Sequence, residues 1–357
     1  MNKINLLQIH EFCIENCKCN FHCAYCHSGY TNGENEHTCK PYFNKQWFDE
    51  NLDMSVPVSK IRFWGGEPFA NWDVYKEVIE YFYRHYTSAS FICNGSLFDK
   101  ERAKWLAEHN VRVHFSHDLA SQSVRGIDFL KMERFKEAAE TMRSVFKEKN
   151  KRYRLSLRKV YHNESKTFND DVEYLEDVAK TIFPDWDFRI SVAFGRGFDV
   201  GSQYVWKAEN LLKYVEDCIS YYEDNGLLAM SFIPNLISRA FVVYDVVKGN
   251  RVPKNLCPAT TNYNAGIPYA ISSTGHLSYC HCYSEYPRST TIRESCSKCK
   301  RRLYCMGACV VTDNSEQCPE WAKLYDGLYE IACKFVEKHS YNKLKELRDS
   351  DYHYFKG

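Results

Sequence analysis

The sequence predicts an α/β fold, an open barrel of six parallel strands with helices outside it, for three reasons. First, from Pro57 to Phe194 short β-like runs alternate with helical stretches that carry a polar face. Second, the apolar run from Ile4 to Ile9 adds an opening strand and completes six βα-like units, an alternation that predicts a parallel sheet with right-handed crossovers. Third, the motifs that carry chemistry each follow a strand, and the catalytic groups of parallel barrels collect at the carboxyl ends of the strands.

The elements follow in a regular order. The run at 4–9 is the first strand and precedes a cysteine loop. Further strands are expected at 60–64, 88–93, 111–116, 153–160 and 187–194, with helices between them at 73–86, 99–109, 128–148 and 170–181. Residues 202–248 are expected to form two further helices.

Composition excludes several classes of protein. The chain has 357 residues, which suggests about two domains, and its 44% apolar content is enough for a sizeable core. The formal net charge of +1 gives no global basic field for nucleic acid, and no run of roughly 18 apolar residues is present to span a membrane. The chain has 17 cysteines, an odd number, and its amino terminus lacks a signal-peptide pattern, which does not fit a secreted disulfide protein. We therefore expect the cysteines to bind metal in a reducing cytoplasm.

Three cysteines in the segment CNFHCAYC form the most informative motif. Cys19, Cys23 and Cys26 can hold three corners of a [4Fe–4S] cluster and leave the fourth iron open to a cosubstrate. Closely spaced cysteines also bind zinc, so the triad alone leaves a zinc site as an alternative. The segment FWGGEPF at 63–69 favours the cluster, because glycines let the backbone approach a ligand and the Glu67 carboxylate can accept hydrogen bonds from an ammonium group.

Together these two motifs resemble the radical S-adenosylmethionine (SAM) enzymes. The resemblance implies a partial (β/α)6 TIM-like barrel in which the three cysteines carry a [4Fe–4S] cluster, SAM chelates the open iron and the GGEP segment holds the SAM amino group. The cofactor-binding residues that it implies are Tyr25, Gly65, Gly66, Glu67, Asn94 and Ser116.

Two of these positions match the family less closely. Asn94 begins a turn similar to the family's TNG turn, and Ser116 begins SHD at 116–118, in the place of the family's SLDG strand end, where a serine contacts the SAM carboxylate. His117 and Leu119 depart from that pattern, and Leu119 stands where the family has glycine. Two arginines are further candidates for the same carboxylate, although arginines at such places are more often salt-bridged or exposed: Arg125 and Arg158.

A second group of cysteines lies in residues 257–318. Its order and several independent spacings resemble the SPASM domain, which binds auxiliary clusters in peptide-modifying radical SAM enzymes, although the 17 residues between Cys257 and Gly275 exceed the usual span. The resemblance implies an outer auxiliary cluster on Cys296, Cys299, Cys305 and Cys318, and an inner one on Cys257, Cys280 and Cys309. The inner cluster takes Cys282 as its fourth ligand or keeps an iron open to a substrate heteroatom. Structural zinc ligation is the alternative for the whole group.

These motifs divide the chain into four expected parts: a radical SAM barrel at 1–200, a helical connection at 201–254, a SPASM domain at 255–335 and a helical tail at 336–357. The first strand starts close to residue 1, so we expect no amino-terminal peptide-recognition domain. Leader binding would then fall to the barrel rim, to residues 202–248 or to a separate leader-peptide-binding protein.

Cysteines outside both motifs are more often small buried hydrophobes. Cys93 is the one candidate catalytic residue among them, a hydrogen donor to a substrate radical, because it ends the third strand and could point into the barrel mouth. His281 follows Cys280 where sulfatase-maturing relatives carry aspartate, which disfavours sulfatase maturation.

The resemblance also implies the reaction. One electron passes from the cluster into SAM, and the resulting 5′-deoxyadenosyl radical abstracts hydrogen from a substrate carbon. We expect a cytoplasmic maturase that crosslinks, oxidises or epimerises a ribosomally made peptide, with a reductase, flavodoxin or ferredoxin as electron donor and no nucleic acid or membrane partner. The alternatives are a radical SAM dehydrogenase or epimerase of a small molecule and, from another class, a non-catalytic iron–sulfur electron carrier, which would not need the GGEP segment.

Overall fold

A computed structural model describes residues 3–5, 11–13, 19–26, 41–55, 58–194, 205–225, 234–250, 270–278, 298–301, 318–343 and 345. Its main strands are β2 (Glu11–Cys13), β4 (Val58–Trp64), β5 (Tyr86–Cys93), β6 (Val111–Ser116), β7 (Leu155–Tyr161), β8 (Phe188–Phe194), β9 (Ala270–Ser272) and β10 (Leu277–Ser278). These strands form one open sheet in the order β10-β9-β2-β4-β5-β6-β7-β8. Every neighbouring pair from β9 to β8 is parallel, and only β9 and β10 pair in the antiparallel sense within the described residues.

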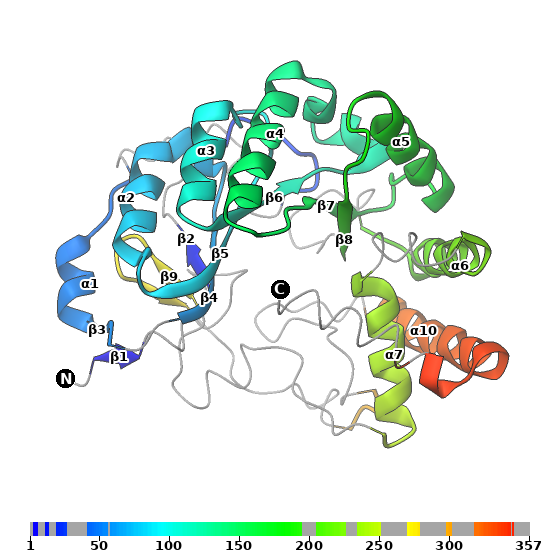
Figure 1. Cartoon of the computed structure of the whole chain (residues 1–357). Coiled ribbons are helices and arrows are strands. Elements are labelled where there is room, and N and C mark those ends of the chain that lie inside the picture. Colours follow the sequence, from blue (N-terminus) through cyan, green and yellow to red (C-terminus); the bar gives the residue numbers. More distant parts are fainter. Residues whose placement is uncertain are drawn as a thin grey trace.

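Helices alternate with these strands as the sequence predicts, and the expected α/β fold is confirmed. Figure 1 shows α2 (Trp72–Phe82), α3 (Lys100–Glu108), α4 (Glu133–Glu148) and α5 (Phe168–Thr181) along the outer side of the curved sheet. Local capping sets their starts: the Asp99 side chain accepts from the Arg102 N–H before α3, and Thr167 and Asp170 form a capping box before α5. The helix expected at 128–148 begins with a 3-10 turn, Phe129–Lys131, before α4.

The opening strand differs from our expectation for residues 4–9. Residues Ile4–Asn5 form β1, which pairs with β3 (Leu52–Asp53) in a separate two-stranded sheet. The first barrel strand is β2, which pairs with β4 and lies just before the cysteine loop. Residues 6–10 lie outside the described residues. Apolar content located a β-like run, but it does not specify which strand the run pairs with.

The main core lies between the sheet and its outer helices. Along β5, Ala89, Phe91 and Cys93 face this core, because alternate residues of a strand point to the same side. Large aromatic rings fill much of it, including Phe12, Phe63 and Phe91, all fully buried. The intervening residues of each strand face the inside of the barrel.

A second core joins three helices beside the barrel: α6 (Ala208–Asn225), α7 (Pro234–Val247) and α10 (Cys318–His339). The two helices expected within 202–248 are therefore confirmed. Trp206 and Trp321 pack edge to face, with ring centroids 4.7 Å apart, and connect α10 to the segment before α6. Helix α10 continues through residue 335, where we expected the SPASM domain to end, so a helix spans that expected boundary.

Strands β9 and β10 form a hairpin on the free edge of β2, although their residues fall in the expected SPASM segment. The N–H of Ser273 donates to the Cys13 carbonyl at 2.9 Å. Gly275 has a φ of +95°, and a Cβ there would lie 2.3 Å from the Trp47 ring, so only glycine fits this turn. Among the helices of the described ranges, none is both long and apolar enough to cross a membrane.

Candidate functional site at the carboxyl edge of the sheet

Three half-buried cysteines lie in the loop that follows β2. The N–H of Cys26 donates to the Cys23 carbonyl at 2.9 Å and closes a turn between these two residues. The N–H of Phe21, a buried residue, donates to Cys19 Sγ at 3.5 Å. A backbone N–H directed at sulfur favours the thiolate, which is the form that binds metals.

A tight turn follows β4 at two glycines. Gly65 and Gly66 have φ angles of 127° and 50°, which residues with a Cβ rarely adopt. The turn carries Glu67 into the interior, where it is fully buried. Its Oε1 accepts from the Phe69 N–H at 3.0 Å and its Oε2 from the Asn94 N–H at 2.7 Å. The carboxylate therefore ties the end of β4 to the end of β5.

Asn94 links this carboxylate to the cysteine loop. Its Nδ2 donates to Asn20 Oδ1 at 2.8 Å and lies 4.0 Å from Cys19 Sγ. Its Oδ1 accepts from Ser96, from the N–H at 3.0 Å and from the hydroxyl at 2.7 Å. Asn20 in turn donates to Ser96 Oγ at 2.9 Å. A continuous set of hydrogen bonds thus runs from the glycine turn to the first cysteine.

A second network, centred on Asp118, supports the far side of the loop. Asp118 is fully buried; its Oδ2 accepts from the Tyr25 hydroxyl and its Oδ1 from the Val160 N–H at 2.9 Å. Arg125 Nη1 donates to the Tyr25 hydroxyl at 2.6 Å and lies 3.7 Å from Asp118 Oδ1. The Cys23 thiol lies 3.9 Å from the Arg125 carbonyl, and the His162 ring stacks on Tyr25 with centroids 4.8 Å apart. These contacts fix the cysteine loop to the ends of β6 and β7.

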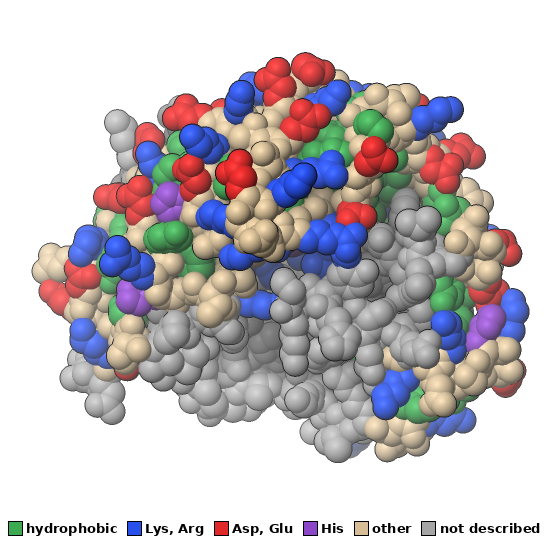
Figure 2. Space-filling view, viewed as in Figure 1, with side chains coloured by type: hydrophobic (Ala, Val, Ile, Leu, Met, Phe, Trp, Pro, Cys, Tyr) green, Lys and Arg blue, Asp and Glu red, His purple; other side chains and the backbone are tan. Residues whose placement is uncertain are grey.

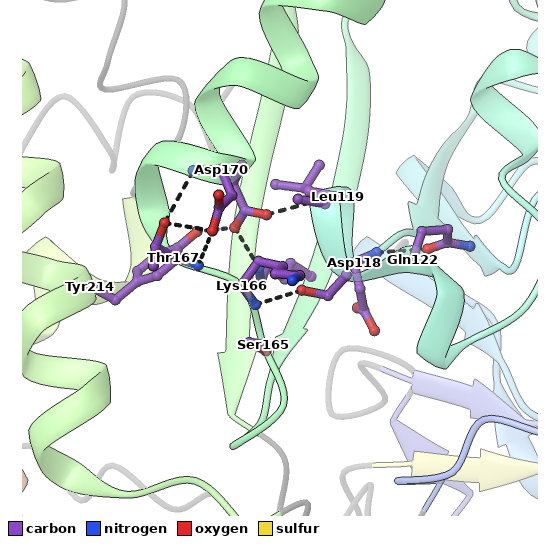
Figure 3. A network of polar contacts seen from close by, with 12 residues as sticks. Asp118, Leu119, Gln122, Ser165, Lys166, Thr167, Asp170 and Tyr214 are labelled. Carbon is purple, nitrogen blue, oxygen red and sulfur yellow. Dashed lines mark hydrogen bonds and ion pairs between the residues drawn. The ribbon is translucent and has the colours of Figure 1, made fainter.

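The segment after Asp118 packs against the start of α5, as Figure 3 shows. The N–H of Lys166 donates to Ser121 Oγ at 2.8 Å, and the N–H of Ala120 donates to Asp171 Oδ1 at 3.1 Å. Leu119 has a φ of 56° and is fully buried. It therefore adopts the left-handed backbone that a glycine favours, at the position where the family pattern has glycine, and its N–H donates to His117 Nδ1 at 2.9 Å.

Burial dominates the electrostatics of the loop. It raises the pKa of the Cys19 thiol and raises that of Cys23 to about 11, while the charge of Arg125 lowers the latter. Burial also raises the pKa of Glu67 to about 7, against the opposing effect of its two backbone hydrogen bonds. Metal binding at the cysteines would therefore release protons.

The thiols suit an iron–sulfur cluster. No three His, Cys, Asp or Glu side chains in the described part of the chain are gathered as the ligands of a single ion would be. A [4Fe–4S] cluster is larger than one ion and takes its thiolates at separate corners, and hydrogen bonds to the sulfurs tune it. Three thiols from one loop, with a backbone N–H and an amide directed at Cys19, fit that group.

The structure brings most of the expected site residues to one edge. Cys19, Cys23, Tyr25, Glu67 and Asn94 belong to the two networks, and Cys26 lies in the same loop. Ser116 ends β6 on the inner side of the sheet, opposite Arg158. We expected the Cys93 side chain to point into the barrel mouth, and the structure contradicts this. It is 2% exposed within the main core, because it shares the side of β5 occupied by Phe91, and burial raises its pKa well above the ordinary value.

The auxiliary ligands are only partly described. Cys299 is half-buried and Cys318 is exposed at the start of α10. The other expected ligands lie outside the described residues: Cys257, Cys280, Cys282, Cys296, Cys305 and Cys309. Both auxiliary ligand sets therefore stay predictions.

Sequence reasoning missed the central residue of the second network. Asp118 closes the segment SHD at 116–118, and its position two residues after the end of a strand was the available signal. Arg125 was considered as a ligand to SAM, whereas here its guanidinium contacts Tyr25 and Asp118. Asn20 and Ser96 carry no motif and became visible only through their contacts.

Comparisons with known proteins agree with this geometry. Solved structures of anSMEcpe share the fold: the form with bound AdoMet has a TM-score of 0.62 and 16% identity, over 94% of this chain and 100% of that chain. The form with AdoMet and the Cp18Cys peptide has a TM-score of 0.61 and 16% identity, over 94% and 99%. At this identity the likeness establishes the fold alone.

The sequence comparisons match part of the chain to a protein superfamily. A curated relative, the radical SAM cyclopropyl synthase TigE of Paramaledivibacter caminithermalis, is 24% identical over 333 residues, which is 82% of this chain. The chain spans 66% of that relative's length, just under two thirds. Residues 16–158 match the family model described as Radical SAM superfamily, and this match covers the cysteine loop, the glycine turn and the ends of β4 to β6. The part of this chain that is similar to the radical SAM superfamily is therefore residues 16–158, which carry the cysteine loop and the glycine turn.

Proposed function

We propose that this chain is a radical SAM enzyme that cleaves SAM reductively and uses the product radical to modify a peptide. The observation that carries the proposal is the hydrogen-bonded connection between Glu67, Asn94 and Cys19, at 2.7 Å and 4.0 Å. It joins the segment that would hold the SAM amino group to the first cluster ligand, so the two cofactors would be neighbours.

Cys19, Cys23 and Cys26 would hold the cluster, and Glu67 with its glycine turn would hold SAM. The bound cofactors supply the electron and the carbon-centred radical. The protein's part is positional. Asn94 directs an amide at the Cys19 sulfur, and Tyr25 anchors the loop on Asp118. A carboxylate has about four lone-pair sites, so Glu67 could accept from an ammonium group as well as from backbone N–H groups.

Two comparisons support a peptide substrate and an oxidative modification. The anSMEcpe structures include complexes with bound peptides, and TigE is named a cyclopropyl synthase. Forming a ring or a crosslink between two carbons removes two hydrogen atoms from the substrate. A radical that abstracts one hydrogen atom, and a one-electron acceptor that oxidises the remaining substrate radical as it loses a proton, would account for both.

The electron acceptor in this proposal is the cysteine-rich segment after residue 255. It would carry two auxiliary [4Fe–4S] clusters, the outer and inner sets expected from the SPASM resemblance, with Cys282 or a substrate atom at the fourth inner position. A small-molecule substrate is the runner-up, and a pure electron carrier remains the alternative of another class. Electrons would enter from a flavodoxin, a ferredoxin or a reductase.

The first test measures iron and SAM cleavage. Anaerobically reconstituted protein should hold roughly twelve irons per chain, and replacing Cys19, Cys23 and Cys26 by Ala should remove about four and abolish 5′-deoxyadenosine formation. The matched control is Cys218→Ala, a buried cysteine of α6 outside every expected ligand set. Stoichiometric zinc without iron, or SAM cleavage in the triple variant, would contradict the proposal.

The second test concerns the substrate. Candidate peptides should stimulate SAM cleavage and emerge about two mass units lighter for each ring or crosslink formed, measured by mass spectrometry. If a sugar or another metabolite stimulates turnover while peptide masses stay unchanged, the small-molecule alternative holds.

A further inference from the structure

A cavity of about 680 Å³ lies at the opposite edge of the barrel from the cysteine loop. The described residues that line it come mostly from the amino-terminal halves of β4 to β8 and from the turns before β6 and β7. They include Ser88 of β5, His114 of β6 and Ser156 of β7, all on the inner side of the sheet. The cavity is separate from the radical SAM site and the proposed chemistry does not use it.

The lining is strongly cationic. Six Lys and Arg side chains, and no Asp or Glu, occur among the described residues that line it, although the whole chain carries a net charge of only +1. Figure 2 shows Lys and Arg side chains gathered in the middle of this face, beside and within a hollow. The six cations are Lys60, Arg112, Lys151, Arg152, Arg154 and Arg189.

Neighbouring groups hold several of these cations in place. The Arg112 guanidinium lies 5.2 Å from the centroid of the Phe146 ring and donates to the Arg152 carbonyl at 2.9 Å. Asp187 accepts two bonds from Arg152 and fixes that side chain at the rim. Lys151 donates to Asn110 Oδ1 at 3.0 Å. Such a preorganised set loses little side-chain freedom when an anion binds.

The cations also disfavour one another's charge. Burial and the charge of Arg189 lower the pKa of Lys60, and burial with the charge of Arg154 lowers that of Arg112. A ligand that brings negative charge would relieve this repulsion.

The distribution of the donors favours several separate carboxylates over one phosphate. Phosphate sites commonly use the N–H groups of a helix N-terminus, but in this barrel the helix N-termini lie at the other edge of the sheet. At this edge Lys149 donates to the carbonyls of Ala107 and Glu108 at the end of α3. The cations are instead spread from β4 to β8, about 19 Å along the curve of five neighbouring strands. The straight line across the concave side is shorter, so an extended acidic peptide of up to about six residues spans the cations.

We propose that this cavity anchors an acidic segment of the peptide substrate, remote from the residue that is modified; this inference rests on the proposed function. Ser88 in the cavity lies six residues before Asn94, about 20 Å along β5, so a ligand here cannot reach the radical site with the same residues. The cavity would add affinity and register to a long substrate, while the carboxyl edge performs the chemistry.

The experiment uses anaerobic, cluster-loaded full-length protein and a fluorescein-labelled hexaglutamate peptide, followed by fluorescence anisotropy. The Lys60→Gln/Arg189→Gln variant should bind the probe about tenfold more weakly than the native protein. The Lys60→Arg/Arg189→Lys variant keeps both charges and should restore binding, which separates lost charge from lost structure. The matched control is Lys100→Gln/Lys104→Gln, two exposed lysines on α3 outside the cavity, with an unchanged affinity expected.

Three results would overturn the inference. The first is that hexaglutamate does not bind, and the second is that the Lys60→Gln/Arg189→Gln and Lys100→Gln/Lys104→Gln variants weaken binding equally. The third is that tripolyphosphate displaces the probe at a lower concentration than unlabelled hexaglutamate does; this result would assign the site to phosphoryl groups. SAM cleavage by the native protein is measured in the same preparation. If it is absent, the proposed function fails whatever the peptide does; if it is present and hexaglutamate does not bind, only the cavity inference fails.

Discussion

The two edges of the barrel sheet use charged side chains in opposite ways. At the carboxyl edge two carboxylates, Glu67 and Asp118, are fully buried, and each accepts hydrogen bonds from groups on other elements. Asp118 also lies 3.7 Å from the guanidinium of Arg125. At the amino edge the charges are Lys and Arg, and they surround a cavity of about 680 Å³. The same strands thus end in a closed network on one side and begin at an open, cationic hollow on the other.

This difference suggests that the carboxyl edge holds the cofactors in a fixed loop, whereas the amino edge recognises a ligand. At the carboxyl edge the polar side chains bond mainly to the protein itself: both Glu67 oxygens accept backbone N–H groups. These bonds fix the loop where the cofactors would bind. The amino edge places its cations around a cavity of about 680 Å³. Substitutions at the first edge should therefore affect folding strongly, whereas substitutions at the second should affect binding.

The largest expected effect compares one carboxylate from each edge. Asp118→Ala leaves Arg125 buried without its carboxylate and should lower the free energy of unfolding by about 3–5 kcal/mol. Asp187→Ala removes an exposed ion pair with Arg152 and should cost at most about 1 kcal/mol. Urea unfolding of both variants under anaerobic conditions measures the two changes. Equal shifts would show that the carboxyl edge is no more tightly built than the rim of the cavity.

A smaller effect is expected at Glu67. Glu67→Gln keeps one acceptor oxygen but directs an amide NH₂ at the second backbone N–H, which should cost about 1–3 kcal/mol of stability. SAM affinity should fall roughly tenfold through loss of the charged acceptor, measured by equilibrium dialysis. Iron content should not change, because Glu67 is not a cluster ligand. Native SAM affinity in this variant would mean that the SAM amino group is held elsewhere.

The smallest expected effect is a loss of folding stability at low pH, caused by His114 on the inner side of the barrel. Burial, with the charges of Arg158 and Arg189, lowers the pKa of His114 well below its ordinary value of 6.5. The unfolded chain then binds more protons than the folded protein below pH 6.5, so stability is lost as the pH falls through that value. At pH 5.5 this residue should cost about 1.4 kcal/mol relative to pH 7.5.

The variant His114→Asn tests this origin of the pH dependence. Its amide can replace the contact of His114 Nδ1 with Ser156 Oγ, at 2.6 Å, but does not titrate. Urea unfolding at pH 5.5 and 7.5 should show a smaller difference in the variant than in the native protein. An identical difference in both would assign the effect to other groups, such as His117 and His162, whose pKa values burial also lowers.

Much of the carboxyl edge was predictable from the sequence because its motifs are local. The spacing of Cys19, Cys23 and Cys26 places three thiols in one loop, and a pair of glycines favours the positive φ angles of the turn at Gly65 and Gly66. The alternation of β-like and helical runs likewise predicted most of the strands and helices, since periodicity depends on neighbouring residues alone.

Tertiary structure decided what depends on distant parts of the chain. The side of β5 that faces the helices placed Cys93 in the core, and pairing with β2 brought residues 270–278 into the barrel sheet. Asp118 became a central residue only when β7 and the cysteine loop met it. The cationic cavity collects residues from five strands and from the turns between them, and among its cations only the group at 151–154 is local in the sequence. Strand order and register set these juxtapositions, and they arise from the packing of the whole sheet, which no local pattern encodes.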